Sequence, residues 1–273
     1  MNAILRILGR ALAVAALSLG AAAVLPQVAS AAPPKIDPTS CGGESVPNAY
    51  CSFQTTGEDI FVANDSCNVE GACTSLGNGI RIGHDSCNGT KACHLANYFG
   101  VSSRIGNASC NSDYACYAAG YDGGTSDIGN DSCNGDEACY DAGVRGSSRI
   151  GNGACNDESA CYLAGYGGAV YGGVSSVGNG SCNGWRACFQ VGYEGSSYVG
   201  NNSCDADQAC YIAGDQEGSS RIGYGSCNAT SACRFAGGNS GSSTIGNHSC
   251  NDESVCEYAG YDDTSIIGNN QLN

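Results

Sequence analysis

The sequence predicts an all-β fold: a single parallel β-helix, or β-solenoid, of about nine 22–23-residue coils, each closed by its own disulfide bond. Three observations lead to this prediction. A C-x5-C pair recurs throughout the chain after residue 60, small and branched residues alternate within each repeat, and there are enough cysteines to staple every coil.

The repeat is visible in the spacing of its first cysteines. From Cys67 to Cys250 they follow one another at intervals of 20, 23, 23, 22, 27, 22, 23 and 23 residues. The segment 147–164, SSRIGNGACNDESACYLA, is a representative copy. Helical repeats need about 33 residues or more, so this unit length favours one β-solenoid coil per repeat.

Alternation within a copy predicts strands in both of its halves. Ile150 and Ala154 flank Asn152 at alternate positions, and Ala160 and Ala164 flank Tyr162 in the same way. A period of two residues is typical of a strand. Stacking the copies then gives columns of Ile or Val, of Ser and of Ala, which are expected to form a thin continuous core.

The 20 cysteines are predicted to form disulfides within coils. Zinc is disfavoured because the chain has no C-x2-C pair and only three histidines. Pairing between coils would strand one cysteine in each nine-membered column, whereas local pairing leaves none over. The predicted pairs are Cys41–Cys51, Cys67–Cys73, Cys87–Cys93, Cys110–Cys116, Cys133–Cys139, Cys155–Cys161, Cys182–Cys188, Cys204–Cys210, Cys227–Cys233 and Cys250–Cys256.

The N-terminus predicts export. Arg6 and Arg10 precede an apolar stretch at 11–25, and small residues ending at Ala31 suit signal-peptide cleavage. The expected organisation is a signal peptide at 1–31, an N-terminal linker and disulfide cap at 32–60, and the solenoid at 61–273. No later stretch is long and apolar enough for a membrane span, so a secreted, extracellular or cell-surface location is expected.

The acidic balance disfavours nucleic acid as a partner. The chain has 11 basic and 26 acidic residues and a formal net charge of −15, which repels phosphate backbones. Two Asn-rich columns, which include Asn152 and Asn156, are expected to form structural ladders at the corners of the coils.

An acidic column raises the hypothesis of a Ca²⁺ site. Asp113, Asp136 and Glu158 occupy the same position in consecutive coils, where carboxylates about 4.8 Å apart repel one another unless water or a cation intervenes. A solvated acidic edge is the competing interpretation.

Aromatic residues suggest two further features. Tyr117, Tyr140, Tyr162, Phe189 and Tyr211 form a ladder that shares strand parity with the Ala columns, so it is expected to point inward. The alternative is an outward ladder, which would offer a stacking platform for sugar rings or polymer chains. The repeat also expands between Cys161 and Cys182, and insertions in solenoids often form the binding face. The predicted ligand-binding residues for a glycan are Tyr166, Tyr171, Trp185 and Tyr193.

The architecture resembles the parallel β-helix of secreted lyases and adhesins in coil length only, so the resemblance implies a fold and no activity. The functional prediction is a structural, adhesive or binding scaffold for a glycan or cell-surface polymer, with Ca²⁺ as a candidate cofactor and end-to-end self-association at the open C-terminal coil. A carbohydrate-active lyase or hydrolase is the alternative, although the acids derive from the repeat and no catalytic cluster stands out. Ice binding is a third hypothesis, disfavoured because no outward T-x-T grid is present.

Overall fold

The computed structural model describes residues 34–42, 50–53, 59–168 and 172–272, which lie in the compact unit Ala31–Asn273. The signal peptide predicted at 1–31 and the ligand-binding residue Tyr171 fall outside the described residues. Within them there are only strands, turns and loops. The described chain accordingly contains no helix with the length and apolarity needed to cross a membrane.

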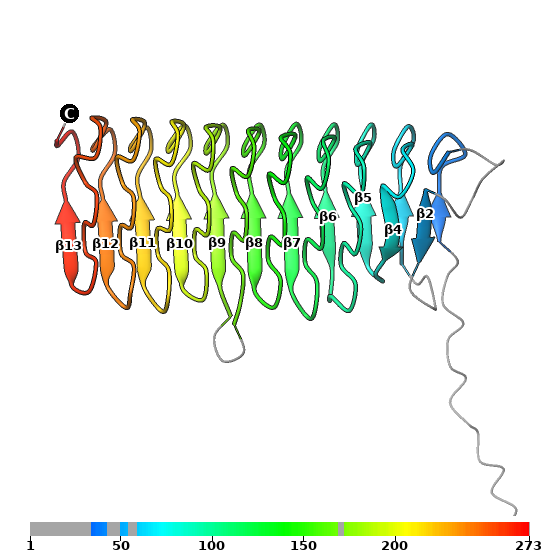
Figure 1. Ribbon diagram of the computed structural model, residues 1–273, viewed down its shortest axis with the longest axis horizontal. Coiled ribbons are helices and arrows are strands. Elements are labelled where there is room, and N and C mark those ends of the chain that lie inside the picture. Colours follow the sequence, from blue (N-terminus) through cyan, green and yellow to red (C-terminus); the bar gives the residue numbers. More distant parts are fainter. Residues whose placement is uncertain (1–33, 43–49, 54–58, 169–171, 273) are drawn as a thin grey trace, which may run out of the picture. The chain divides into compact units, whose positions relative to one another are not determined.

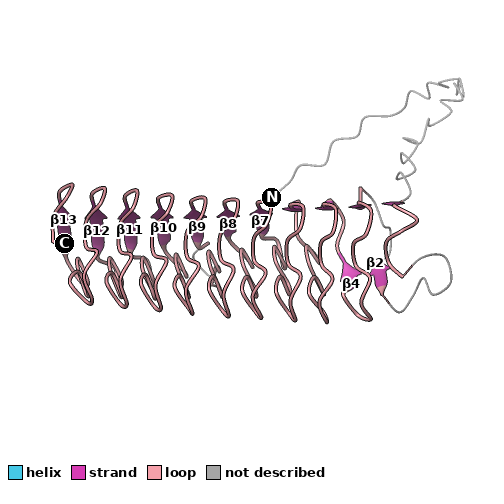
Figure 2. Cartoon of the chain, turned by 90° about the horizontal axis from the view of Figure 1, so that it is seen from above, coloured by secondary structure: helices cyan, strands magenta, loops and turns pink. Residues whose placement is uncertain are grey.

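The strands form two parallel sheets. The larger sheet has eleven strands in the order β1-β3-β5-β6-β7-β8-β9-β10-β11-β12-β13, and β2 pairs with β4 in a small second sheet. Figure 1 shows the strands side by side in sequence order, and Figure 2 shows β2 and β4 on the other side of the coils from β7–β13. The bounds are β1 (Lys35–Ile36), β2 (Cys51–Phe53), β3 (Phe61–Val62), β4 (Cys73–Leu76), β5 (Ile80–Ile82), β6 (Ser103–Ile105), β7 (Thr125–Ile128), β8 (Ser147–Ile150), β9 (Val174–Val177), β10 (Ser196–Val199), β11 (Ser219–Ile222), β12 (Ser242–Ile245) and β13 (Thr264–Ile267).

Each coil contributes one strand to the large sheet, which confirms the predicted parallel β-solenoid of about nine turns. Ser196 pairs with Ser219, and Ser219 pairs with Ser242, so successive strands are in register one repeat apart. The sheet begins before residue 61, because β1 pairs with β3. The segment 32–60 therefore contributes a strand to the solenoid.

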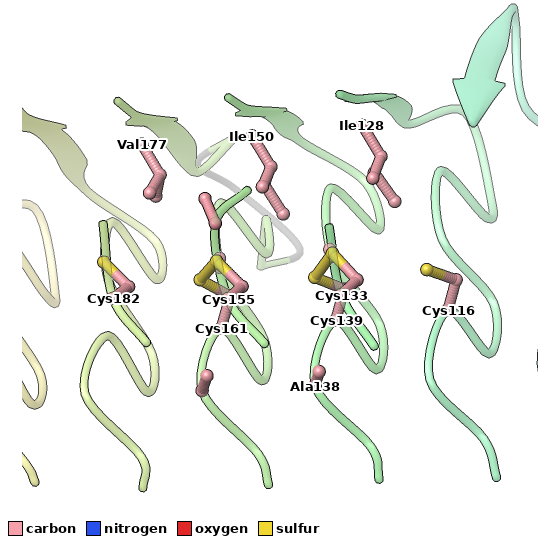
Figure 3. Packing of buried hydrophobic residues seen from close by; sticks show 14 of the residues in the cluster. Cys116, Ile128, Cys133, Ala138, Cys139, Ile150, Cys155, Cys161, Val177 and Cys182 are labelled. Carbon is pink, nitrogen blue, oxygen red and sulfur yellow. A yellow bond between two sulfur atoms is a disulfide. The ribbon is translucent and has the colours of Figure 1, made fainter. Parts of the chain in front are cut away.

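The core is a narrow file of side chains inside the coils. In the four-residue strands of the large sheet the second and fourth residues point inward, and the Ile or Val that ends each strand is buried from β3 to β12. Figure 3 shows Ile128, Ile150 and Val177 facing the disulfides across this interior. Fully buried Ala residues such as Ala138 fill the remaining width. The largest side chains fully buried in the described interior are accordingly those of Ile and Leu.

All ten predicted disulfides are present, and all are local. Nine join cysteines six residues apart, and Cys41–Cys51 joins residues ten apart. No free cysteine remains among the described residues. Every disulfide therefore closes a small loop inside one coil. This is the pairing predicted from the odd number of cysteines in each column, which pairing between coils would have left with one free thiol.

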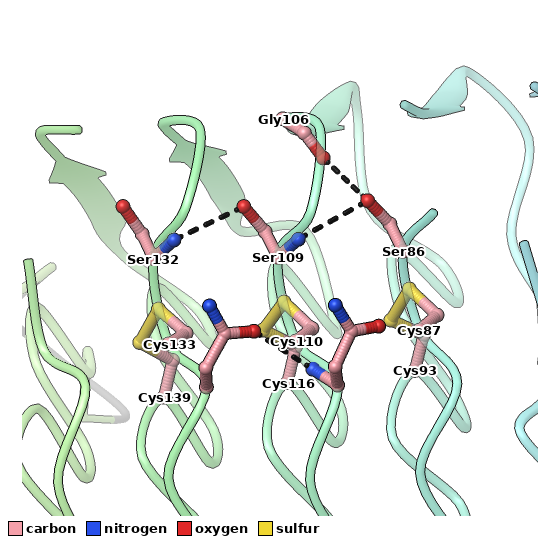
Figure 4. The surroundings of a disulfide bond; sticks show 12 residues. Ser86, Cys87, Cys93, Gly106, Ser109, Cys110, Cys116, Ser132, Cys133 and Cys139 are labelled. Carbon is pink, nitrogen blue, oxygen red and sulfur yellow. Dashed lines mark hydrogen bonds between the residues drawn. A yellow bond between two sulfur atoms is a disulfide. The ribbon is translucent and has the colours of Figure 1, made fainter. Parts of the chain in front are cut away.

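Serine and asparagine ladders join the coils at one corner, which confirms the structural role expected for the Asn columns. The Oγ of Ser109 donates to Asn107 O at 2.9 Å and to Gly129 O at 2.8 Å, and it accepts from Ser132 N at 3.2 Å. Beside it, Asn111 N donates to Asn134 Oδ1 at 3.1 Å. Figure 4 shows the contact between Ser132 and Ser109, and the equivalent contacts of Ser86 with Ser109 and Gly106, next to the disulfides. Backbone groups that do not belong to a strand are satisfied in this way.

The strand expected over 160–164 was wrong, and among its equivalents in the described chain only the first copy forms a strand, β4. From the next coil on, this half of each coil is a succession of tight turns, with left-handed residues four apart at Cys133 (φ 56°), Glu137 (φ 54°), Asp141 (φ 55°) and Arg145 (φ 52°). Ala160 and Ala164 are four residues apart, and this spacing fits a period of four as well as the period of two that suggested a strand. Sequence spacing alone could not distinguish the two conformations.

Backbone hydrogen bonds explain why this succession of turns, here called the turn ribbon, is stable. Glu137 N donates to Asp113 O of the preceding coil at 3.0 Å, whereas Ala138 N closes a local turn on Gly135 O at 3.2 Å. The pattern then repeats, since Cys139 N donates to Ala115 O at 2.7 Å and Tyr140 N to Glu137 O at 3.2 Å. Amides alternately hold neighbouring coils together and hold each turn closed.

Candidate functional site

The outward face of the large sheet carries one continuous row of side chains, here called the outer row. In β8 the burial alternates, so that Arg149 is exposed while Ser148 and Ile150 are buried. The third position of each four-residue strand therefore faces outward. Strand register places the members of the outer row next to one another in the order Lys35, Phe61, Arg81, Arg104, Asp127, Arg149, Ser176, Tyr198, Arg221, Thr244 and Ile266.

The outer row is hollowed over the strands β1–β9. A depression of about 550 Å³ lies over β5–β9, and it shares Arg81 and Arg104 with a second depression of about 470 Å³. A third depression, of about 450 Å³, shares Phe61 and His84 with the second and reaches Lys35. We call these three depressions, which share lining residues with one another, the sheet groove.

The sheet groove gathers positive charge on an acidic protein. Lys35, Arg81, Arg104 and Arg149 line it, against Asp37 and Asp127, while the whole chain carries a formal charge of −15. The excess of basic over acidic side chains makes the electrostatic potential in the groove positive. Asp37 is half-buried, and hydrogen bonds from the amide and hydroxyl of Thr39 lower the pKa of its carboxyl.

Arg81 and Arg104 differ from the other arginines of the described chain, because neither has an ion-pair or aromatic partner there. Arg149 Nε lies 3.9 Å from Asp127 Oδ2 and Arg145 Nε 2.5 Å from Asp122 Oδ2. The remaining three guanidinium groups lie over aromatic rings: Arg186 over Trp185, Arg221 over Tyr198, and Arg234 over Phe235. The two unengaged guanidinium groups occupy adjacent strands of the groove.

The four residues predicted to bind a glycan are only partly brought together. The rings of Tyr166 and Tyr193 stack with centroids 5.2 Å apart and planes 7° apart. Trp185 has a different neighbour, the guanidinium of Arg186 at 4.6 Å from its ring centroid. Tyr171 lies outside the described residues. A glycan site at these four residues stays a prediction.

The acidic column does not form a metal cage within the described part of the chain. Asp113, Asp136 and Glu158 are all exposed, and Asp113 Oδ1 accepts a hydrogen bond from Thr90 N at 2.8 Å. The described groups of three ligand atoms within 4.8 Å of one another consist of cysteines, which are all in disulfides. Ca²⁺ binding to the column stays a prediction, and thermal melts with Ca²⁺ and with a chelator test it.

The aromatic ladder lies outside the core, so the expectation that it points inward was wrong. The five rings from Tyr117 to Tyr211 are half-buried and are absent from the buried cluster. In a ribbon with a period of four, Tyr162 lies midway between the inward Ala160 and Ala164 and therefore faces outward. The rings stack on one another in consecutive coils, with centroids 4.7–5.1 Å apart.

Asp215 is a buried acid that the sequence reasoning missed. It is 8% exposed, its Oδ1 has no hydrogen-bond partner among the described residues, and burial raises the pKa of its carboxyl to about 6. In the preceding two coils Tyr166 and Tyr193 hold the equivalent position, directly after the glycine that ends the Ala column. Comparing that column across the copies would have shown the exception.

Comparison with known proteins places part of the chain. Residues 28–122 match the model of a domain of unknown function, DUF7640. Searches of curated proteins and of solved structures returned no match. The β-solenoid architecture agrees with the resemblance drawn from coil length. The matching family model names no activity.

Proposed function

We propose that this protein is a rigid binding scaffold that holds a linear polysaccharide along the sheet groove. A disulfide-rich β-solenoid is consistent with a structural or binding protein. The observation that carries the proposal is the groove itself, a polar hollow that crosses strands β1–β9 on a flat sheet face.

The groove offers donors and acceptors at a regular spacing. Parallel strands are about 4.8 Å apart, close to the rise of one sugar residue in an extended polysaccharide. Thr125, Ser147 and Ser176 present hydroxyl groups beside the outer-row arginines. Successive sugar residues can therefore meet equivalent groups on successive coils, which suits a linear polymer better than a compact ligand.

The scaffold is preorganised for this task. Ten disulfides and the intercoil ladders hold the strands in place before any ligand arrives, so binding does not have to order the site. The disulfides suggest an oxidising, extracellular environment. Our proposal includes export with cleavage after Ala31 and a site of action at the cell surface or beyond it.

Blocking the groove tests the proposal. We would measure retention of the full chain in gels that contain linear polysaccharides, both neutral and acidic. Ser147→Trp fills the groove and should abolish retention of the protein by the gel. Ser242→Trp, at the same strand position in β12 and outside the groove, should leave retention at the wild-type level. Wild-type protein that no polysaccharide retains contradicts the proposal.

The same polysaccharides serve to test the enzyme alternative. Release of reducing ends or of unsaturated products would show turnover, and unchanged polymer length together with retention would show binding alone. End-to-end association is a separate prediction, and the molar mass from light scattering at high concentration tests it.

A further inference from the structure

Resting on the proposed function, we infer that the occupant of the sheet groove is an acidic polysaccharide, one that carries carboxylate groups, and that Arg81 and Arg104 select it. These two guanidinium groups lie opposite each other on adjacent parallel strands, since Arg81 of β5 pairs in register with Arg104 of β6. Both side chains are exposed on the outer face.

The pair is electrostatically unfavourable when it stands alone. Like charges directly opposite each other on neighbouring strands destabilise a sheet. Within the described chain no carboxylate forms an ion pair with either residue: Asp127, in register next to Arg104, has its carboxylate 3.9 Å from Arg149 on its other side. An anionic group bound between Arg81 and Arg104 would remove their repulsion.

The chemistry of the pair favours a planar oxyanion. Guanidinium groups present forked donors that match a carboxylate in a bidentate manner, and such charge-assisted hydrogen bonds are about twice as strong as neutral ones. Lys35 at the end of the groove adds a third cation about two strands from Arg81. A chain with an acid group on successive sugars can satisfy all three cations.

The charge contrast supports a polysaccharide over a nucleic acid. The groove gathers four basic side chains of a protein whose net charge is −15, so a densely charged phosphate backbone would meet mostly acidic surface outside it. Binding of single-stranded nucleic acid also relies on aromatic platforms for the bases. Phe61 and His84 are the two residues with aromatic rings that line the described groove.

The experiment compares matched polymers and matched variants of the full chain. Polygalacturonate is the acidic probe, its methyl ester is the neutral counterpart, and a sulfated polysaccharide tests whether the anion must be a carboxylate. The variants are Arg81→Gln, Arg104→Gln and their double substitution. Arg221→Gln is the control, because Arg221 holds the same outer-row position in β11, outside the groove.

We expect polygalacturonate to bind at least about tenfold more tightly than its ester, and added salt to weaken its binding. Each single variant should lose about threefold to tenfold for polygalacturonate, the double variant should bind both polymers alike, and Arg221→Gln should match the wild type. No variant should melt below the wild type, because all three side chains are exposed and the changes at Arg81 and Arg104 also remove a repulsion between like charges.

The failures are distinguishable. Equal binding of polygalacturonate and its ester by the wild type overturns this inference and leaves the proposed groove function standing. Absence of binding to both polymers, and to every other polysaccharide, overturns the proposed function as well. Tighter binding of the sulfated polymer contradicts the carboxylate assignment, and tighter binding of single-stranded DNA contradicts a polysaccharide occupant.

Discussion

The rings of Tyr117 and Tyr140 stack nearly parallel, with centroids 4.7 Å apart and planes 6° apart. The same relationship continues from Tyr140 to Tyr162, so both faces of the Tyr140 ring are covered by neighbouring rings. A ring whose faces are covered cannot stack against a sugar. The ladder is therefore a stabilising spine between the coils, and the carbohydrate recognition that we propose is assigned to the opposite, stranded side of the repeat.

Removing one ring from this spine should destabilise the protein. We expect Tyr140→Ala to lower the free energy of unfolding by about 1–2 kcal/mol, because it ends two stacked contacts, and Tyr140→Phe to lower it by less. Chemical denaturation measures both. Retention by polysaccharide gels should be unchanged in both variants. An equal loss from Tyr140→Phe would show that the hydroxyl group, and not the stacking, stabilises the coils.

Two buried serines should respond to the same substitution with opposite signs. Ser148 is 1% exposed, and its Oγ has no hydrogen-bond partner among the described residues. Ser132 is equally buried, but its Oγ donates to Asn130 O at 2.8 Å and to Gly151 O at 2.7 Å and accepts from Ala154 N at 3.3 Å.

We therefore expect Ser148→Ala to raise the free energy of unfolding by about 1 kcal/mol and Ser132→Ala to lower it by about 1–3 kcal/mol. Thermal or urea unfolding of the two variants side by side is the measurement. Destabilisation by Ser148→Ala would contradict the prediction and indicate that an ordered water satisfies this hydroxyl.

Asp215 should make stability depend on pH. Burial raises the pKa of its carboxyl from 3.8 to about 6, so the native state keeps the proton to a higher pH than the unfolded chain does. The free energy of unfolding should therefore fall as the pH rises from about 4 to 6. Asp215→Asn should raise it by on the order of 1–2 kcal/mol at neutral pH and leave it unchanged below pH 3.8. A gain of equal size at both pH values would point to a cause other than titration.

A single staple should contribute locally. We expect the double substitution Cys133→Ala and Cys139→Ala to lower the free energy of unfolding by about 2 kcal/mol, which is the chain-entropy value for so short a loop. Peptide mapping should find the other nine pairs unchanged. Rearranged pairing between coils in this variant would contradict the independence of the staples.

The fold was predictable because nine copies of one pattern average out local exceptions. The cysteine pair represented by Cys155 and Cys161 recurs in all nine copies. The Ile or Val represented by Ile150 precedes the first cysteine at the same distance in each copy. Side-chain direction in the turn ribbon was not predictable, because Ala160, Tyr162 and Ala164 satisfy periods of two and of four equally well. Only the left-handed backbone at residues such as Ser159 and Leu163 distinguishes the two, and it is not encoded by glycine there.

The sheet groove escaped sequence reasoning for a different reason. Arg81 and Arg104 occupy a position that is variable between copies, holding Asp127, Ser176 or Thr244 elsewhere, so no column of like residues marks it. Their effect depends on strands being parallel and in register, which brings residues 23 apart to adjacent places. The expected aromatic site followed an insertion in the sequence, whereas the charged surface follows from the regular part of the repeat.

Local closure of every disulfide has a consequence for how such a chain can change its length. Because Cys133 bonds to Cys139 in the same coil, deletion or duplication of one whole coil leaves no cysteine without its mate. The flanking strands can then pair with each other in the register that any two copies share. Genes that gain or lose whole repeats would thus encode longer or shorter solenoids of the same pattern. Each of these solenoids could form all of its disulfide bonds with the same local pairing.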